Sequence, residues 1–318
     1  MLNQPNIIAL RHSLANAIVG QTALLDRLVI GLLTGGHILL EGLPGLAKTT
    51  AVKALSNSVH ASFQRIQFTP DLLPGDLTGT DIYNPQAGSF CFVEGPLFHE
   101  IILADEINRA PAKVQSALLE AMQEHQITVG GVTRALPPLF MVMATQNPLE
   151  QSGTYPLPEA QLDRFLLHVE LDYPTAEEEL LILQRDRTAR TNNAAPAPGM
   201  DVHTVLAARE EVKQVHLSNE LERYIVTLVG ATRNIGQHLP QLADMIEVGA
   251  SPRASLAIAH AASAHAYLQG RDYVIPDDIL AVAPDCLRHR IILSFNARME
   301  KLSRNDLILA LLAVVPVP

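Results

Sequence analysis

The stretch "LLEGLPGLAKTT", residues 39–50, decides how the first half of this chain folds. It nearly matches G-x-x-x-x-G-K-[ST], the glycine-rich loop that holds phosphate groups between a strand and a helix. Gly42, Lys48 and Thr49 stand at the expected positions, but Ala47 replaces the second glycine. The question is whether this one departure destroys the site.

Ala47 is compatible with a phosphate-binding loop. Glycine is required where φ is positive or where a Cβ atom would strike the ligand. Gly42 and Gly45 can form the tight part of the loop, whereas Ala47 falls at the entrance to the following helix, where ordinary helical angles suffice. For this stretch taken alone, an ordinary strand-to-helix turn is the alternative.

The flanking sequence favours a nucleotide site. The run "HILL" (37–40) predicts a buried strand before the loop, and residues 49–59 predict a helix after it. In such a setting Lys48 would reach the β and γ phosphates and Thr49 would hold Mg²⁺. The predicted ATP-binding residues are Gly42, Leu43, Pro44, Gly45, Leu46, Ala47, Lys48, Thr49 and Thr50.

Bulk composition narrows the class of protein. The 318 residues are 48% hydrophobic and 18% charged, which is typical of a soluble globular chain with room for two domains. A net charge of −10 argues against tight nonspecific nucleic-acid binding. Cys91 and Cys286 form no ligand pair, and no two histidines have i,i+4 spacing, so we expect no zinc site. The sequence has no signal-peptide layout and no long apolar run, which predicts a cytoplasmic protein without membrane insertion.

The first half of the chain alternates strands and helices, which predicts an α/β fold with a mostly parallel sheet. Two interruptions read as hairpins, one over 80–95 turning near Gly88 and one over 127–136 turning at Gly130-Gly131. A strong helix is predicted at 111–125. The remaining predicted strands are 62–68, 100–105, 139–146 and 165–171.

Beyond residue 172 the pattern becomes helical. Thr175 and Glu178 form a capping box before a helix that runs to about Arg190. A flexible connection is predicted over 190–200, and later helices are predicted to begin at Ser251-Pro252 and at Pro276. We therefore expect an α/β domain at 1–172 and an all-helical domain at 173–318.

Acidic and amide side chains follow two of the predicted strands. The run "IILADE" places Asp105 and Glu106 just past an apolar strand, which we expect to lie beside strand 37–41 in the sheet. Nucleotide hydrolysis needs a carboxylate for the Mg²⁺ shell, predicted to be Asp105, and a group that orients or deprotonates water, predicted to be Glu106. In "MVMATQNP", Asn147 could hydrogen-bond the γ phosphate or the attacking water.

Two arginines stand near predicted helix ends. Arg164, in "PEAQLDRF", ends one helix, and Arg253, in "GASPRAS", is the second residue of another. A cation in the first turn of a helix opposes the macrodipole, at a cost of about a few tenths of a kcal/mol, unless an anion lies nearby. A nucleotide phosphate would supply that anion. For Arg164 a surface salt bridge is the alternative.

Five stretches in this order, "EGLPGLAKT", "ADEINRAP", "ATQNP", "GTYPLPEAQLDRF" and "GASPRAS", resemble the MoxR family of AAA+ ATPases. The resemblance covers essentially the whole chain, and alanine at the position of Ala47 is a feature of that family. It implies an AAA+ αβα nucleotide-binding core with a helical lid domain. It also implies Walker A residues at Lys48 and Thr49 and a Walker B pair at Asp105 and Glu106.

The same resemblance assigns further roles. It implies that Asn147 is the sensor 1 residue, that Arg253 is the sensor 2 arginine, and that Arg164 is an arginine finger reaching a neighbouring subunit, with Arg109 a less favoured finger. The hairpin at 80–95 resembles a helix-2 insert, and that at 127–136 a pre-sensor 1 hairpin, both facing a central pore. The residues expected at the adenine base are Val19, Gly20 and Gln21.

The resemblance implies a homo-hexamer that binds ATP and Mg²⁺ between subunits and acts like a chaperone in maturing, remodelling or activating protein complexes. A partner with a von Willebrand factor A domain is expected, besides the protein client. A magnesium-chelatase-like motor for metal insertion and a nucleotide-gated scaffold with little turnover are the alternatives. A DNA-translocating ring is disfavoured because 80–95 has no Lys or Arg and 127–136 has only Arg134.

Overall fold

The computed structural model describes residues 1–18, 21–42, 48–86, 88–147, 153–191 and 199–318. The chain forms two compact units. The core unit comprises residues 9–158 and 169–206, and the helical unit comprises residues 1–8, 159–168 and 207–318. Each unit combines segments that are separate in the sequence. The predicted domain boundary near residue 172 divides the chain into two continuous parts instead, and this boundary stays a prediction.

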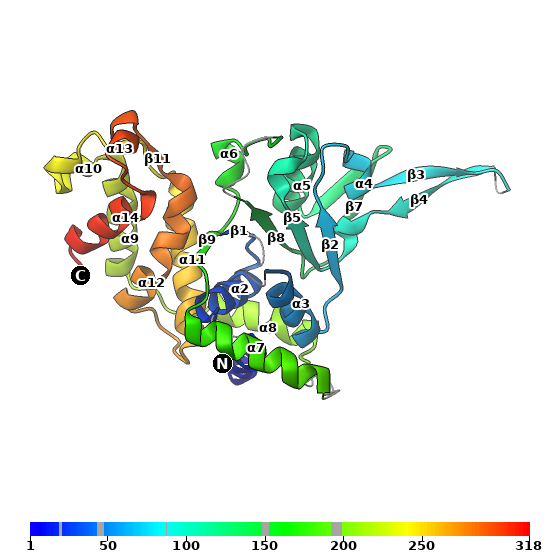
Figure 1. Cartoon of the computed structure of the whole chain (residues 1–318), viewed down its shortest axis with the longest axis horizontal. Coiled ribbons are helices and arrows are strands. Elements are labelled where there is room, and N and C mark those ends of the chain that lie inside the picture. The colour runs from blue at the N-terminus through cyan, green and yellow to red at the C-terminus, as the bar shows by residue number, and fades with distance from the viewer. Residues whose placement is uncertain (19–20, 43–47, 87, 148–152, 192–198) are drawn as a thin grey trace. The chain divides into compact units, whose positions relative to one another are not determined.

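A five-stranded sheet has the order β2-β5-β8-β1-β9 (Figure 1). The pairs β2–β5, β5–β8 and β8–β1 are parallel. The central strands are buried almost throughout, as expected of parallel strands covered on both faces. The strands are β1 (Ile38–Gly42), β2 (Phe63–Gln67), β5 (Ile101–Asp105), β8 (Met141–Gln146) and β9 (Leu167–Leu171). All five match a predicted strand.

One expectation about the sheet is wrong. The strand that carries Asp105 was expected beside β1, but β8 lies between β1 and β5 and pairs with both. Met143, for example, faces Ile38 on one side and Leu103 on the other. Crossover connections in α/β sheets can skip a strand position, so order along the chain does not give order in the sheet.

Helices flank this sheet (Figure 1). Two helices, α1 (Gln4–Ala17) and α2 (Thr22–Thr34), precede β1, and α3 (Lys48–Ser58) follows it. Helix α5 (Ala112–Glu124), predicted at 111–125, buries Val114, Leu118 and Met122, which recur at four-residue spacing on one face. Three shorter helical segments are α4 (Pro74–Thr78), η1 (Pro96–Phe98) and η2 (Ile107–Arg109).

Both predicted hairpins are present in the core unit. Strands β3 (Gly79–Asn84) and β4 (Ser89–Glu94) are antiparallel, as are β6 (Gln126–Val129) and β7 (Val132–Ala135). Gly130 and Gly131 turn the second hairpin with φ of 60° and 77°, values that a two-residue hairpin turn requires. The guanidinium of Arg134 lies 3.7 Å from the Phe92 ring centroid and so connects the two hairpins.

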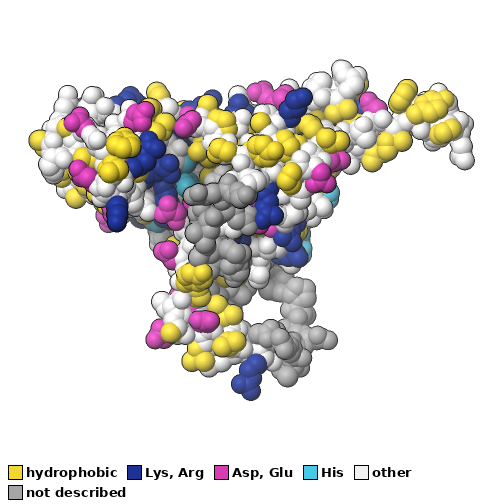
Figure 2. Space-filling model, turned by 45° about the horizontal axis from the view of Figure 1, so that its top comes forward, with side chains coloured by type: hydrophobic (Ala, Val, Ile, Leu, Met, Phe, Trp, Pro, Cys, Tyr) yellow, Lys and Arg dark blue, Asp and Glu magenta, His cyan; other side chains and the backbone are white. Residues whose placement is uncertain are grey.

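The β3–β4 hairpin projects from the core unit and exposes apolar side chains (Figures 1 and 2). Tyr83 and Phe90 are 53% and 72% exposed, and their ring centroids lie 5.3 Å apart. Ile82 and Val93 add further exposed apolar area. An exposed apolar surface of this kind is typical of an interaction site.

The remaining helices of the core unit follow β9. Helix α7 (Ala176–Thr191) starts with the predicted capping box, in which the Thr175 N–H donates to Glu178 and the Glu178 N–H donates to the Thr175 hydroxyl. Helix α8 (Val202–Val212) comes next. Most of the predicted flexible connection over 190–200 lies outside the described residues.

The helical unit is rich in helices that begin at serine caps. Ser218, Ser251, Ser294 and Ser303 each accept a hydrogen bond from a backbone N–H in the first turn. Its helices are α6 (Glu159–Leu162), α9 (Asn219–Arg233), α10 (Ile235–His238), α11 (Pro252–Leu268), α12 (Pro276–Leu287), α13 (Phe295–Met299) and α14 (Arg304–Val314), with 3-10 turns η3 (Pro240–Leu242) and η4 (Arg288–Arg290). The helical unit also contains an antiparallel strand pair, β10 (Ile246–Val248) and β11 (Ile292–Leu293), which the prediction of an all-helical domain does not include.

Across the described parts of the chain, no helix combines the length and the apolarity needed to cross a bilayer.

Candidate nucleotide site

The carboxyl ends of four strands meet at one edge of the sheet. Glu41 of β1 pairs with Gln146 of β8, and Gln67 of β2 pairs with Asp105 of β5. Because the strands are parallel, the residues that follow them gather at this edge, where α/β sheets bind ligands. Gly42, Glu106 and Asn147 are therefore brought to the same side of the core unit, as predicted.

Lys48 starts α3 and turns back toward the strand before the loop. Its Nζ donates a hydrogen bond to the Gly42 carbonyl oxygen at 2.5 Å. Burial lowers the pKa of Lys48, and the nearby charges of Asp105, Glu106 and Glu41 oppose that change. The ammonium group thus lies within electrostatic reach of both predicted acidic residues, which are more than fifty positions away in the sequence.

Thr49 and Thr50 follow Lys48 in the first turn of α3, where Thr49 is half-buried and Thr50 exposed. Gln21 immediately precedes α2. The other predicted nucleotide contacts lie outside the described residues: Val19, Gly20, Leu43, Pro44, Gly45, Leu46 and Ala47.

Asp105 is engaged through both carboxylate oxygens. Oδ1 accepts a hydrogen bond from the Thr145 hydroxyl at 2.6 Å, and Oδ2 accepts from Arg65 Nη2 at 2.5 Å and Nε at 3.1 Å. Thr145 is buried on β8, so the strand between β1 and β5 positions the carboxylate. Asp105 ends β5 with an oriented, negatively charged oxygen pair.

Glu106 occupies a strained backbone position directly after β5. Its φ of 57° and ψ of 50° lie in the left-handed region, which non-glycine residues adopt rarely and often at functional sites. Its N–H donates to the Thr145 hydroxyl at 2.9 Å, so one side chain holds both acidic residues. Its Oε2 accepts a hydrogen bond from Gln67 at 2.7 Å and lies 3.1 Å from Arg109 Nε.

Three residues that contact Asp105 or Glu106 are not among the residues predicted from the sequence: Arg65, Gln67 and Thr145. Arg65 and Gln67 are two positions apart on β2 and so share one face of the strand, a signal that period-2 alternation of polar residues could have given. Thr145 lies within a buried apolar strand, where a hydroxyl needs a partner. Both signals point to the acidic pair only once β2 and β8 are known to flank β5.

The donor chemistry of this edge fits Mg²⁺. The ion prefers oxygen ligands and usually takes only one or two from the protein, with phosphates and water supplying the rest. Asp105 and the Thr49 hydroxyl are such donors. Among the residues that the structure describes, no cluster of three metal-ligating side chains occurs.

The two predicted arginines lie in the helical unit. Arg164 follows α6, and its N–H donates to the Gln161 carbonyl at 3.2 Å. Arg253 is the second residue of α11, as expected, and its Nη1 lies 3.9 Å from Asp163 Oδ2. These two arginines belong to the helical unit, whereas Lys48, Asp105 and Glu106 belong to the core unit.

Comparison with known proteins gives a consistent assignment. A model of the ATPase family associated with various cellular activities (AAA) matches residues 37–167, and an AAA lid domain model matches 242–310. The chaperone MoxR1 of Mycobacterium tuberculosis is 46% identical over 304 residues, which cover 95% of this chain and 79% of that protein. The chain belongs to the MoxR family of AAA+ ATPases.

Two further matches extend over nearly the whole chain. Protein MoxR of Methylorubrum extorquens is 30% identical over 325 residues, covering 96% of this chain and 94% of that protein. A crystal structure of a protein from Cytophaga hutchinsonii superposes with a TM-score of 0.93 at 47% identity and covers the whole chain. The predicted fold, an AAA+ α/β core with a predominantly helical lid, is confirmed.

Proposed function

We propose that this MoxR-family chain hydrolyses ATP with Mg²⁺ in a homo-hexameric ring and uses the cycle for chaperone-like remodelling, maturation or activation of protein complexes. The observation that carries the proposal is the convergence of Lys48, Asp105 and Glu106 at one edge of the parallel sheet. Family membership supports the general class, an ATPase.

Each residue at this edge has a distinct role in the proposal. Lys48 binds the β and γ phosphates, Thr49 and Asp105 hold Mg²⁺ with its water shell, and Glu106 orients or deprotonates the attacking water. Asn147, one position beyond β8, contacts the γ phosphate or that water. The bound Mg²⁺ supplies charge stabilisation for phosphoryl transfer, while the chain supplies positioning.

Arginine contacts complete the proposed site. Arg253 acts as the sensor 2 residue, and Arg164 acts in trans as the finger that stabilises transition-state charge on a neighbour's ATP. Arg109 is the weaker finger candidate because its guanidinium already pairs with Glu106 of its own chain. Hydrolysis that depends on a trans residue depends on assembly.

The client is proposed to be protein rather than nucleic acid. The relative from Mycobacterium tuberculosis is named a chaperone, and the exposed aromatic residues of the β3–β4 hairpin suit contact with polypeptide. That hairpin carries no Lys or Arg with which to bind phosphates. A partner with a von Willebrand factor A domain and a cytoplasmic location complete the proposal.

The test is steady-state ATP hydrolysis with Mg²⁺ over a wide range of protein concentration, combined with sizing and with Glu106→Gln. Activity per subunit should rise with concentration as rings form. Glu106→Gln should lower kcat by about 10²–10⁴-fold, because it removes the group that acts on water, while ATP binding persists. Glu124→Gln, at an exposed position at the end of α5, is the matched control and should leave kcat unchanged.

Undiminished hydrolysis in Glu106→Gln would remove Glu106 from the proposed role. Nucleotide binding without turnover at any concentration would favour the nucleotide-gated scaffold instead. Stimulation of hydrolysis by a metal-insertion client rather than by a protein complex would favour the magnesium-chelatase-like motor.

A further inference from the structure

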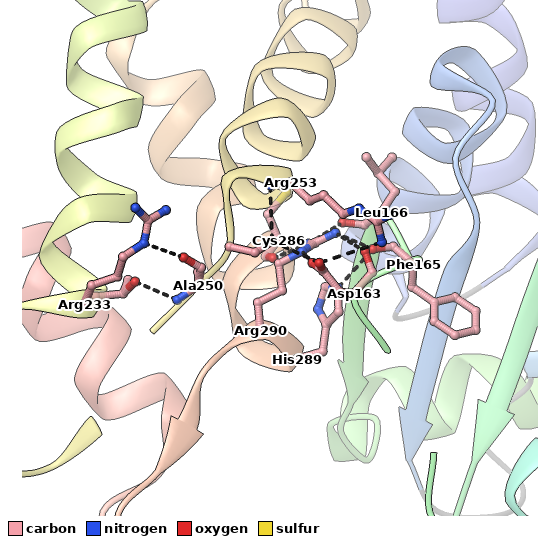
Figure 3. A network of polar contacts seen from close by, with 11 residues as sticks. Asp163, Phe165, Leu166, Arg233, Ala250, Arg253, Cys286, His289 and Arg290 are labelled. Atoms are coloured by element: carbon pink, nitrogen blue, oxygen red, sulfur yellow. Dashed lines mark hydrogen bonds and ion pairs between the residues drawn. The ribbon is translucent and has the colours of Figure 1, made fainter. Parts of the chain in front are cut away.

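A buried arginine organises the segment that carries Arg164. The Arg290 side chain is only 3% exposed, and its Nε pairs with Asp163 Oδ1 at 2.6 Å (Figure 3). Its Nη1 and Nη2 donate to the backbone carbonyl of Cys286 at the end of α12 and to backbone carbonyls of the segment 163–166. A guanidinium buried in this way is stable only when its donors are satisfied, so the arrangement is rigid.

Arg290 fixes the backbone on both sides of Arg164. Its Nη2 donates to the Asp163 carbonyl at 3.2 Å and to the Phe165 carbonyl at 2.7 Å. The Phe165 carbonyl also accepts a hydrogen bond from His289 Nε2 at 3.0 Å. The backbone from which the Arg164 side chain extends is therefore held by two adjacent residues of η4.

Asp163 connects this segment to the helix that carries Arg253. Its second carboxylate oxygen, Oδ2, accepts a hydrogen bond from the Ser251 hydroxyl at 2.9 Å and faces Arg253 Nη1 at 3.9 Å (Figure 3). The Ser251 hydroxyl also caps α11 by accepting from the Arg253 N–H at 3.2 Å. One carboxylate thus contacts Arg290, the cap of α11 and Arg253 at once.

The stretch before Arg253 is anchored from its other side as well. The Ala250 N–H donates to the Thr232 hydroxyl at 2.9 Å, and the Ala250 carbonyl accepts from Arg233 Nε at 2.8 Å. A Cβ on Gly249 would lie 2.6 Å from the Thr232 carbonyl oxygen, so only glycine allows this approach. The motif "GASPR" is therefore clamped between α9 and Asp163.

We propose that Asp163 and Arg290 are positioning residues that join Arg164 and Arg253 into one rigid element. This inference rests on the proposed function, in which Arg253 contacts nucleotide in its own subunit and Arg164 contacts the neighbour's. A shift of α11 that follows nucleotide contact at Arg253 is then transmitted through Ser251 and Asp163 to the backbone of Arg164. Adjacent ATP sites of the ring are coupled by this element.

The kinetic test compares Asp163→Asn and Ser251→Gly with wild type at a protein concentration that saturates assembly. Asp163→Asn should lower kcat by about tenfold through misplacement of the arginines, with KM changed by less than about threefold. Ser251→Gly, which keeps the Asp163–Arg290 pair and a tolerated cap residue, should show a smaller loss of the same kind. Asp244→Asn, at an exposed loop position of the same unit, is the control and should match wild type.

A double-mutant cycle identifies the residue through which Asp163 acts. In an Arg253→Ala or Arg164→Ala background, Asp163→Asn should cost much less than its tenfold loss in wild type, because the positioned group is already gone. Losses that multiply independently in both backgrounds, or wild-type kcat in both Asp163→Asn and Ser251→Gly, would overturn the inference. Thermal unfolding of each variant shows whether it is folded, and Ser251→Gly carries the test if Asp163→Asn is not.

Amide hydrogen exchange tests the rigid element without any hydrolysis. Ser251→Gly should raise exchange not only at 251–254 but also across the contact, at 163–166, relative to Asp244→Asn. Increased exchange confined to 251–254 would contradict the coupling. If wild type showed no ATP turnover at any concentration, only the proposed function would be contradicted. The hydrogen-exchange result tests the rigid element independently of hydrolysis.

Discussion

The acid–base pairs at the sheet edge of the core unit are more exposed to water than two pairs in the helical unit, Arg290–Asp163 and Arg271–Asp278. At the sheet edge, the side chains of Arg65 and Asp105 are 48% and 19% exposed, and Arg109 pairs with Glu106 at 37% and 27%. In the helical unit, Arg290 is 3% exposed where it pairs with Asp163, and Asp278 is fully buried against Arg271.

The more exposed ion pairs can be exchanged for other contacts, whereas the buried ion pairs fix the positions of the residues that they join. Pairs open to solvent contribute about 0–1 kcal/mol, so Asp105 and Glu106 can change partners at little cost if metal and nucleotide bind there as proposed. Breaking a buried pair by removing one partner costs about 3–5 kcal/mol, because an uncompensated charge is left behind. The pairs of Arg290 and Arg271 therefore hold their segments in place, whereas the contacts at the sheet edge can rearrange.

The largest effect on stability is expected at Asp278, whose side chain is fully buried. Its carboxylate accepts hydrogen bonds from Arg271 at 2.6 and 2.7 Å, from His265 at 2.7 Å and from the Ile275 N–H at 2.8 Å. Asp278→Asn should lower the free energy of unfolding by about 3–5 kcal/mol, measured by urea denaturation. The exposed pair Lys213–Glu210 is the matched control, and Glu210→Gln should change stability by less than about 0.5 kcal/mol.

Equal losses in these two variants would show that burial does not separate the two classes of pair.

A smaller effect on the free energy of unfolding is expected when the pH is lowered. Burial alone would raise the pKa of Asp278, but its hydrogen bonds from Arg271, His265 and Ile275 prevail and lower the pKa from the ordinary 3.8 to about 2. Because the folded pKa lies below the unfolded one, the contribution is complete above about pH 4 and is lost as pH falls through 2. Urea denaturation of wild type should show this loss between pH 4 and 2.

Asp278→Asn is the control for the pH experiment, because it cannot titrate. Its stability should fall less steeply than that of wild type over the same range. Parallel slopes for the two proteins would assign the acid sensitivity to other carboxylates.

Local patterns were enough to predict the elements that surround the candidate nucleotide site. The strand that ends at Gly42, the apolar strand that ends at Asp105 and the Gly130-Gly131 turn are each specified by a few adjacent residues, and each is present. Cap positions such as Ser251 were found for the same reason, since a serine followed by proline marks a helix start within three residues.

Contacts between distant segments were not predictable in this way. The order of β8 and β5 depends on how crossovers pack, and Thr145 and Arg65 acquire meaning only once that order is known. Arg290 lies 127 positions from Asp163, and nothing in a single sequence marks it as the partner. Sequence spacing predicts which residues carry chemistry, whereas packing decides which residues hold them.

The smallest effect is expected from breaking the exposed pair at Asp105. Arg65 donates two hydrogen bonds to Oδ2 of the carboxylate that is proposed to hold Mg²⁺, so the guanidinium and the metal compete for the same group. Arg65→Gln removes this competitor. The free energy of unfolding should change by less than about 1 kcal/mol, because the Arg65 side chain is about half exposed to water. The Mg²⁺ concentration for half-maximal ATP hydrolysis should fall by up to about fivefold, the same energy expressed as affinity.

Lys113→Gln, an exposed cation on α5, is the control for lost positive charge and should leave the Mg²⁺ dependence unchanged. Mg²⁺ dependence of fluorescent ATP binding, measured without turnover, should shift in the same direction as hydrolysis. A rise in the required Mg²⁺ would mean that Arg65 orients Asp105 for the metal rather than competing with it. The sheet edge would then be a fixed frame like the helical unit, and exposure alone would not distinguish the two regions.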